Sequence, residues 1–371
     1  MKQRVLNEQL RDLTNGGTES SHKLNGRGVK AIACAEPPLG DPVSRRKGRV
    51  FMALLAVQYG LQPLLQKACV DKDTVNKTSF VMVTEFVKVV LCLVTIISSG
   101  RRTYKSMFQN WSLRESLMAA ATPAALYALQ NWLAQVAYMN LDSLTFNLLN
   151  QTKTLFAALC LYLVMGRRQS VVQLLALAML LFAAVLLNAH SSSSRRDEKG
   201  ALGLGGDGRV PWWSSESQLW LGVFPVIGAS FLSGLSASVT QRTLQCERRN
   251  SYLLSMELAV YGVMVLLIST IQSEDGERIR QDGFLYGWTP YTLVPLFSQA
   301  LGGMVVGQVT KHAGSVQKGF ALIAGILVTA AVQTVLENSS LSATHWIAAV
   351  LVAAGTYLHA SFPHQQRSKA E

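Results

Sequence analysis

The chain has 371 residues, of which 49% are hydrophobic and only 15% are charged, and its formal net charge is +12. Its apolar residues are concentrated in about ten stretches of membrane-spanning length, which excludes a soluble globular protein and indicates a polytopic membrane protein. The positive charge lies mostly in short segments between these stretches, where basic residues act as topology signals, so nucleic acid is not an expected partner.

The apolar stretches predict an all-α fold with ten transmembrane helices, because lipid offers no partners for exposed backbone groups. The predicted spans are Val50–Cys69, Ser79–Ser98, Ser116–Met139, Leu144–Met165, Val171–Ala189, Gln218–Thr240, Tyr252–Ile271, Tyr291–Thr310, Val316–Leu336 and Thr344–Ala360. Residues 1–49 have mixed charge and no apolar core of a signal peptide, so we expect a disordered tail there, and residues 362–371 form a second tail.

The second span contains two opposite charges. Glu85 and Lys88 are three residues apart and therefore share one face of a helix. Because a paired acid and base cost less in lipid than two isolated charges, we interpret them as a structural or gating ion pair. Direct contact with a cargo is the alternative.

The third and sixth spans contain polar and small residues that could line a cavity. Tyr127 and Asn131 share a helix face next to Gln130, and a ring beside an amide suits stacking on a nucleobase and hydrogen bonding to its edge. Ordinary hydrogen bonding between helices is the alternative. Ser233 and Gly234 either allow close helix packing or let the backbone approach a ligand, and the sequence leaves both open.

The fourth span carries five polar residues near its middle, Asn147, Asn150, Gln151, Thr152 and Lys153. A lysine at that depth costs about 2.5–3.5 kcal/mol on insertion scales, so it normally faces a water-filled cavity or a partner. The sequence therefore predicts a polar cavity beside this helix.

The longest internal loop, residues 190–217, is rich in serine, glycine and charge and is expected to be a linker between two sets of five spans. Two equivalent sets of five, residues 50–189 and 218–361, must have opposite orientations in the membrane. This predicts two inverted five-helix repeats, an arrangement found in many transporters. About twice as many Lys and Arg residues fall on the side of the termini, so both termini are predicted to be cytoplasmic and the linker lumenal.

A short resemblance between the halves supports the repeats. TKTLFAAL (Thr152–Leu159) and QKGFALIA (Gln317–Ala324) each have a lysine at the second position, Lys153 and Lys318, in the fourth span of their half. A two-fold axis in the membrane plane would bring these lysines together, where two positive charges suit an anionic cargo such as a diphosphate. For Lys318, snorkelling from a helix end to the interface is the alternative.

The spans show no pattern typical of an enzyme. No histidine lies mid-span beside an acid, no hydrolase, metalloprotease or phosphate-loop motif occurs, and the five cysteines have no metal-ligand spacing. We therefore expect neither an enzymatic activity nor a metal or cofactor.

Several segments in order resemble the nucleotide-sugar transporter family: PAALYALQN, LDSLTFNLLNQTK, GRRQS, SGLSAS and GGMVVGQVTKHAGSVQKGF. The resemblance covers about Val50 to Ala360 and is strongest to the branch that includes the CMP-sialic acid, UDP-galactose and UDP-N-acetylglucosamine carriers. It implies ten helices, a Golgi or endoplasmic reticulum membrane, and exchange of a cytosolic nucleotide sugar for a lumenal nucleoside monophosphate. Lys153 and Lys318 match the family's phosphate-contacting lysines, and Tyr127, Asn131, Ser233 and Gly234 match residues that line its nucleotide pocket.

Departures from the family pattern bear on the cargo. Phe146, Ser255 and Ala259 replace a tyrosine, an asparagine and a tyrosine of the CMP-sialic acid carriers' pocket, which disfavours that cargo. VQYGLQPLLQK, LDSLTF and LNQTK look more like carriers of UDP-N-acetylhexosamines, with UDP-galactose next.

The resulting hypothesis is an antiporter that exchanges a UDP-sugar for UMP by alternating access, through rocking of the two five-helix halves. The alternatives are an exporter of another small metabolite and a membrane scaffold without transport. The expected partners are the exchanged nucleotides and the bilayer, and a homodimer stays open.

Overall fold

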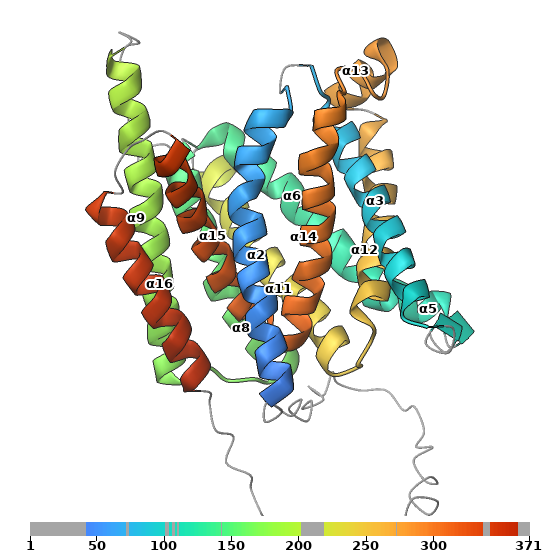
Figure 1. Cartoon of the computed structure of the whole chain (residues 1–371), viewed down its shortest axis with the longest axis horizontal. Helices are drawn as coiled ribbons and strands as arrows, with labels where there is room; N and C mark the ends of the chain where they lie inside the picture. Colours follow the sequence, from blue (N-terminus) through green and yellow to red (C-terminus); the bar gives the residue numbers. More distant parts are fainter. Residues whose placement is uncertain are drawn as a thin grey trace, which may run out of the picture. The chain divides into compact units, whose positions relative to one another are not determined.

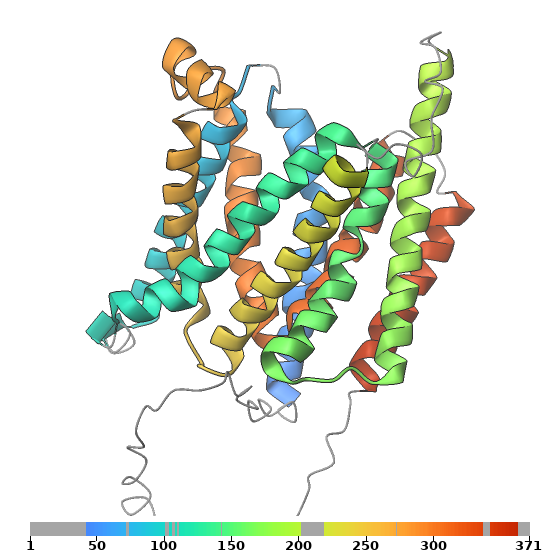
Figure 2. The same cartoon turned by 180° about the vertical axis from the view of Figure 1, so that it is seen from behind.

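Every regular element in the described part of the chain is helical, as the composition predicts. A computed structural model describes residues 42–71, 74–100, 104–105, 108–109, 111–141, 143–201, 219–271, 273–336 and 342–362. The helices are α2 (Pro42–Cys69), α3 (Lys77–Ser98), α5 (Leu113–Ser116), η1 (Leu117–Ala121), α6 (Thr122–Asn140), α7 (Ser143–Asn150), α8 (Lys153–Met165), α9 (Val171–Ala201), η2 (Leu219–Val223), α11 (Phe224–Gln245), α12 (Ser251–Thr270), α13 (Glu274–Asp282), η3 (Pro290–Thr292), α14 (Leu293–His312), α15 (Ser315–Leu336) and α16 (Ala343–Ser361), shown in Figures 1 and 2.

Among the described residues, six helical segments are long and apolar enough to cross a membrane. They are Lys77–Ser98, Thr145–Met165, Trp220–Gln245, Ser251–Thr270, Pro290–His312 and Ser315–Leu336. The four other predicted spans coincide with helices as well, in α2, α6, α9 and α16. Large apolar side chains point outward, with Phe86 65%, Ile268 71% and Leu336 70% exposed. An apolar exterior of this kind is expected where the surrounding solvent is lipid.

Two predicted boundaries are wrong. The first helix begins at Pro42, eight residues before the predicted span, so part of the expected tail is helical. Helix α9 continues to Ala201, through the first part of the expected linker. Both extensions are polar, but proline is favoured in a first helical turn, and charged residues such as Arg, Glu and Lys favour helix. The rest of both tails and residues 202–218 of the linker lie outside the described residues.

The short polar helix α13 is a feature that the hydrophobic pattern missed. Ser273 caps its first turn, which is rich in acidic residues. Asn76 caps α3 by accepting hydrogen bonds from Thr78 N and Ser79 N, and its Nδ2 donates to Asp275 O at 3.0 Å. Thr78 Oγ1 also donates to Asp275 Oδ2 at 2.6 Å. These bonds dock α13 on the start of α3.

The long helices pack in a specific set of pairs. Helix α11 packs on α6 and α8, while α2 packs on α14 and α15. Helix α3 packs on α12, and α9 packs on α16, which lies beside it at one edge of the bundle in Figures 1 and 2. The largest buried cluster lies where α8, α9, α15 and α16 meet, around Leu180, Phe320 and Val352. The start of α2 and the end of α16 lie at the same end of the bundle (Figure 1).

Glycines set the closest of these approaches. A Cβ on Gly60 of α2 would lie 2.5 Å from Gly325 O and 2.7 Å from Val328 Cβ of α15. No side chain fits at such distances without moving a helix backbone, so the α2–α15 crossing depends on glycine at this position.

We expect Gly60→Ala to lower the midpoint of thermal unfolding of the purified protein in detergent, because overpacking of this crossing costs about 1–3 kcal/mol. Gly262→Ala in α12 is the matched control, since a Cβ there meets nothing within 4 Å. Alanine also favours helix over glycine by about 1 kcal/mol, so the control should be neutral or slightly stabilised. Equal midpoints for the two variants would contradict the proposed role of Gly60.

Candidate functional site

The fourth predicted span is interrupted at its middle. Helix α7 ends at Asn150, and α8 begins at Lys153. Between them Gln151 N donates to Leu148 O at 3.2 Å and Thr152 N donates to Leu149 O at 3.0 Å, so the hydrogen bonds tighten to the i−3 pattern. Discontinuous helices of this kind supply backbone groups to substrate sites in transporters.

The break places a positive charge at a helix N-terminus inside the span. Lys153 is the first residue of α8, which runs for 13 residues to Met165. Its side chain is half-buried. The N–H of Thr154 in the first turn of α8 already donates to Gln151 O at 3.2 Å, so the preference for an anion at this point rests on the helix dipole and on the lysine.

Lys318 reaches the same region from α15. A Cβ on Gly319 would lie 3.2 Å from Thr154 Cγ2, so the residues that follow the two lysines are in contact. Lys318 is half-buried, as Lys153 is. The structure thus brings together the two lysines that the repeat predicts, an arrangement that favours the cavity interpretation of Lys318 over snorkelling.

Gly234 of α11 lies against α8, one turn beyond Lys153. A Cβ on Gly234 would lie 2.6 Å from Phe156 C and 2.7 Å from Ala157 N. The backbones of α11 and α8 therefore touch here, which favours the packing interpretation of this glycine. Ser233 beside it is half-buried, as are Asn147 on α7 and Gln151 in the break.

The polar residues of α6 form a separate group. Tyr127 is half-buried and Asn131 is exposed. Gln130 Nε2 donates to Asn131 Oδ1 at 3.4 Å, whereas the buried Gln130 Oε1 has no hydrogen-bond partner among the described residues. An unmatched buried acceptor costs about 1–3 kcal/mol, so this amide is available for a ligand or water. Helix α11 packs on α6, which carries this polar group, and also on α8, which carries Lys153.

Glu85 and Lys88 form an ion pair. Lys88 Nζ lies 2.6 Å from both carboxylate oxygens of Glu85, with 15% and 21% of the Lys88 and Glu85 side chains exposed. The pair lies against α14, because a Cβ on Gly303 would be 2.7 Å from Lys88 Cε. It is therefore part of the α3–α14 contact.

A row of glutamines, which the hydrophobic pattern did not indicate, lies between α2 and α14. Gln58 Nε2 donates to Gln62 Oε1 at 3.2 Å, and the Nε2 atoms of both Gln62 and Gln66 donate to Gln299 Oε1, at 3.3 and 3.2 Å. The signal was the spacing of glutamines at i, i+4 and i+8 in α2, which places them on one face.

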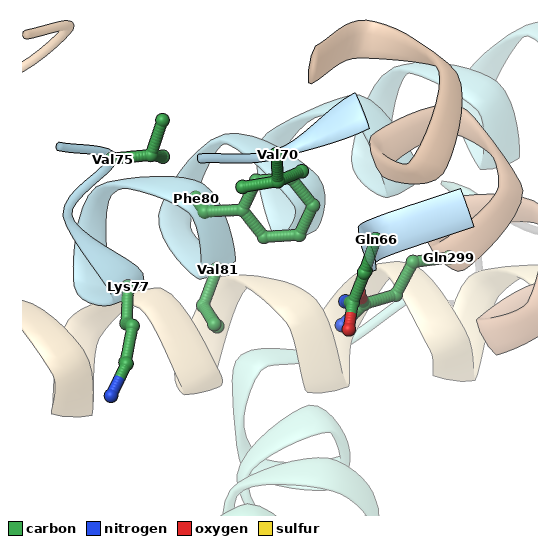
Figure 3. A pocket seen from close by; sticks show the side chains of 7 residues that line it. All are labelled: Gln66, Val70, Val75, Lys77, Phe80, Val81 and Gln299. Carbon is green, nitrogen blue, oxygen red and sulfur yellow. The ribbon is translucent and has the colours of Figure 1, made fainter. Parts of the chain in front are cut away.

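A pocket opens at the end of this row. Its volume is about 280 Å³, and Gln66, Gln299, Phe80 and Lys77 are among its lining residues (Figure 3). Small-molecule sites usually begin near 300 Å³, so this pocket is too small for a whole nucleotide sugar. None of the predicted site residues lines it.

A buried ion pair on α12 was also missed. Glu257 is only 5% exposed and accepts hydrogen bonds from Arg249 Nε at 3.1 Å and from Trp111 Nε1 at 2.8 Å. Since Trp111 precedes α5 and Arg249 precedes α12, the carboxylate ties two loops to one helix. The signal in the sequence was an acidic residue, Glu257, in an apolar run eight residues after Arg249.

Comparisons with known proteins agree with this architecture. A protein of known crystal structure superposes with a TM-score of 0.61 at 12% identity, covering 85% of this chain and 96% of that one, which shows a shared fold. The UDP-N-acetylglucosamine transporter ROCK1 of Arabidopsis thaliana is 40% identical over 319 residues, 86% of this chain and 93% of that protein. The UDP-N-acetylglucosamine transporter of Rattus norvegicus is 27% identical, covering 76% and 84%, and the UDP-galactose translocator of Mus musculus is 25% identical, covering 92% and 86%.

A sequence model of the nucleotide-sugar transporter family matches residues 48–360. The match begins in the polar first turns of α2 and ends at the last turn of α16, so it includes α8 and α15, the helices that carry Lys153 and Lys318. The chain belongs to the nucleotide-sugar transporter family.

Proposed function

We propose that this protein carries a UDP-sugar from the cytosol into the Golgi or endoplasmic reticulum lumen in exchange for UMP. The observation that carries the proposal is the convergence of Lys153 and Lys318 at the N-terminus of the half-helix α8. Two ammonium groups and a helix end can neutralise a diphosphate away from bulk water. The names of the relatives favour UDP-N-acetylglucosamine or a similar UDP-N-acetylhexosamine as cargo, with UDP-galactose next.

The pairing of helices supports the proposal of ten helices in two inverted repeats. If α2 corresponds to α11, α6 to α14 and α8 to α15, the pair α8–α11 corresponds to α15–α2, and α6–α11 corresponds to α14–α2. The pairs α3–α12 and α9–α16 then each map onto themselves. A two-fold axis that relates the two halves produces symmetric pairs of this kind, as inverted repeats do.

The same pairing of helices indicates which helices would move together during transport. Helix α2 packs on α14 and α15 of the second half, and α11 packs on α6 and α8 of the first. The units that rock are therefore better defined as the α6–α8–α11 group and the α2–α14–α15 group, each with one helix exchanged between the halves. Lys153 belongs to one group and Lys318 to the other, so a phosphate bound by both would hold the groups together.

Exchange follows from this arrangement. UDP-sugar and UMP share phosphate and uracil, so both can use the lysines, with Tyr127 and Asn131 holding the base. Bound cargo stabilises the closed state between the two groups, and an empty carrier with two facing positive charges crosses slowly.

The basic residues near the helix ends favour cytoplasmic termini, and the common end of α2 and α16 in Figure 1 agrees with an even number of spans. A homodimer stays a prediction.

Lys153→Ala is expected to abolish uptake of labelled UDP-sugar into proteoliposomes, because one of the two phosphate-binding charges is lost. Lys67→Ala is the matched control, since Lys67 is an exposed lysine in the last turn of α2. A panel of UDP-, GDP- and CMP-sugars would identify the cargo. Full uptake by a folded Lys153→Ala protein would contradict the phosphate-binding role of Lys153. Absence of uptake of every sugar by folded wild type would favour the scaffold, and inhibition by another small metabolite but not by UMP would favour the metabolite exporter.

Uptake of UDP-sugar should require UMP inside the liposomes. We expect an increase of about tenfold or more over liposomes that contain buffer alone, because the return step of the empty carrier is slow. The measurement is the initial rate of uptake at increasing internal UMP. Equal rates with and without internal nucleotide would show uniport and contradict the exchange mechanism.

The Glu85–Lys88 pair should behave as a unit in stability measurements. Glu85→Gln alone leaves Lys88 charged without its partner, and Lys88→Met alone leaves Glu85 charged, so each single variant is expected to lose about 3–5 kcal/mol if the pair is fully buried and less at the observed exposure. The double variant should regain most of this loss. Additive losses in the double variant would show that the two residues act separately.

A further inference from the structure

One buried glutamine of α11 holds the start of α15. Gln241 is only 3% exposed. Its Oε1 accepts hydrogen bonds from Ser315 N at 2.8 Å and from Ser315 Oγ at 2.7 Å. The N–H of Ser315 is one of the orphan donors of a helix N-terminus, so Gln241 caps α15 from a different helix.

A second glutamine extends the contact to the end of α14. Gln241 Nε2 donates to Gln245 Oε1 at 3.0 Å, and Gln245 Nε2 donates to Thr310 O at 3.0 Å and to Lys311 O at 3.2 Å. Arg167, in the turn after α8, donates to the same Gln245 Oε1 at 2.9 Å. We call Gln241 and Gln245 the glutamine clamp.

The clamp joins the two helix groups at one end of the bundle. Gln241 and Gln245 belong to the α6–α8–α11 group, whereas Thr310 and Ser315 belong to the α2–α14–α15 group. The α14–α15 turn lies against the start of α2, where the rings of Phe51 and His312 stack with centroids 6.0 Å apart. The clamp is therefore on the side of the bundle where both termini are predicted to lie.

The clamp also lies close to the cargo site. Lys318 is three residues after Ser315, and its N–H donates to Gly314 O at 3.2 Å. Gly314 has a φ of +96°, and a Cβ there would lie 3.1 Å from Gln241 Nε2. The direction in which α15 leaves this turn, and with it the place of Lys318, thus depends on the clamp.

We propose that Gln241 is a positioning residue for transport, which sets Lys318 by capping α15 and holds the cytoplasmic side closed in this conformation. The inference rests on the proposed function, because only a cargo that enters between the two groups requires the clamp to open. The bonds of the clamp that cross from one helix group to the other join neutral groups, and such bonds are weak enough in net terms to break in every cycle. Loss of the clamp should therefore shift the resting population toward the conformation open to the cytoplasm.

The test is Gln241→Ala, measured from both sides of the membrane. We expect the apparent KM for UDP-sugar on the cytoplasmic face to fall about five- to tenfold and the apparent KM for UMP on the lumenal face to rise by a similar factor. Opposite shifts are the signature of a changed population, since a purely structural defect lowers activity without them. Ser315→Ala removes one of the two bonds and should give smaller shifts in the same directions, which keeps the test available if Gln241→Ala fails to fold.

Gln173→Ala is the matched control. Gln173 is another buried glutamine that joins two helices, because its Nε2 donates to His359 O at 3.3 Å between α9 and α16, outside the two groups. We expect it to lower thermal stability and leave both apparent KM values unchanged. If Gln241→Ala behaves in the same way, the clamp is merely structural and the proposal is overturned.

A second readout does not depend on the cargo. Hydrogen–deuterium exchange of the full chain in nanodiscs should be faster at Ser315–Phe320 in Gln241→Ala than in wild type, and unchanged there in Gln173→Ala. If the amides of Ser315–Phe320 exchange as slowly in Gln241→Ala as in wild type, the proposal is overturned. If wild-type protein exchanges no nucleotide at all, the proposed function fails, while this measurement still decides whether the clamp controls the start of α15.

Discussion

A positive charge near the middle of a membrane span constrains the rest of this structure. Lys153 can be charged at that depth only if helices surround it and leave space for water or an anion. The break before α8 turns a helix end toward the same place, and Lys318 adds a second charge from the other side. Two facing ammonium groups without an anion are electrostatically unfavourable, so in the proposed mechanism the energy gained on binding a phosphate brings the two helix groups together.

The exchange of helices between the halves has a mechanical meaning. Because α2 packs with α14 and α15 while α11 packs with α6 and α8, neither half of the chain is a packing unit by itself. Close glycine contacts, Gly60 with Gly325 and Gly234 with α8, lie inside the two groups. The contacts between the groups include hydrogen bonds of neutral amides, which are easier to break. Rigid crossings within groups and weak polar contacts between them are the properties that a rocking carrier needs.

Sequence predicted the helical class and the six spans that the structure describes as long and apolar enough to cross a membrane, because each has a strong local signal. The role of the two lysines stays a prediction. Hydrophobicity ends where the lipid ends, and a lysine in an apolar run is conspicuous. Helix ends outside the lipid were missed, since polar turns such as those at Pro42 and after residue 189 form helix without any change in hydrophobicity. The glutamine clamp was missed for another reason: Gln241 and Ser315 are 74 residues apart. Their pairing depends on how α11 and α15 cross, which no local pattern records. The sequence predicted Gly234 as a site residue and left packing as the alternative. Its close contact with the backbone of Phe156 in the structure favours packing.

The docking of α13 also has a consequence for covalent modification. Asn76-Lys77-Thr78 has the form of an acceptor for N-linked glycans. The nitrogen that a glycan would occupy, Asn76 Nδ2, donates to Asp275 O, while the hydroxyl of Thr78 is engaged by the carboxylate of the same aspartate. A glycan on Asn76 would replace one of the two N–H groups of this Nδ2 atom, so glycan attachment and the docking of α13 compete for the same atom.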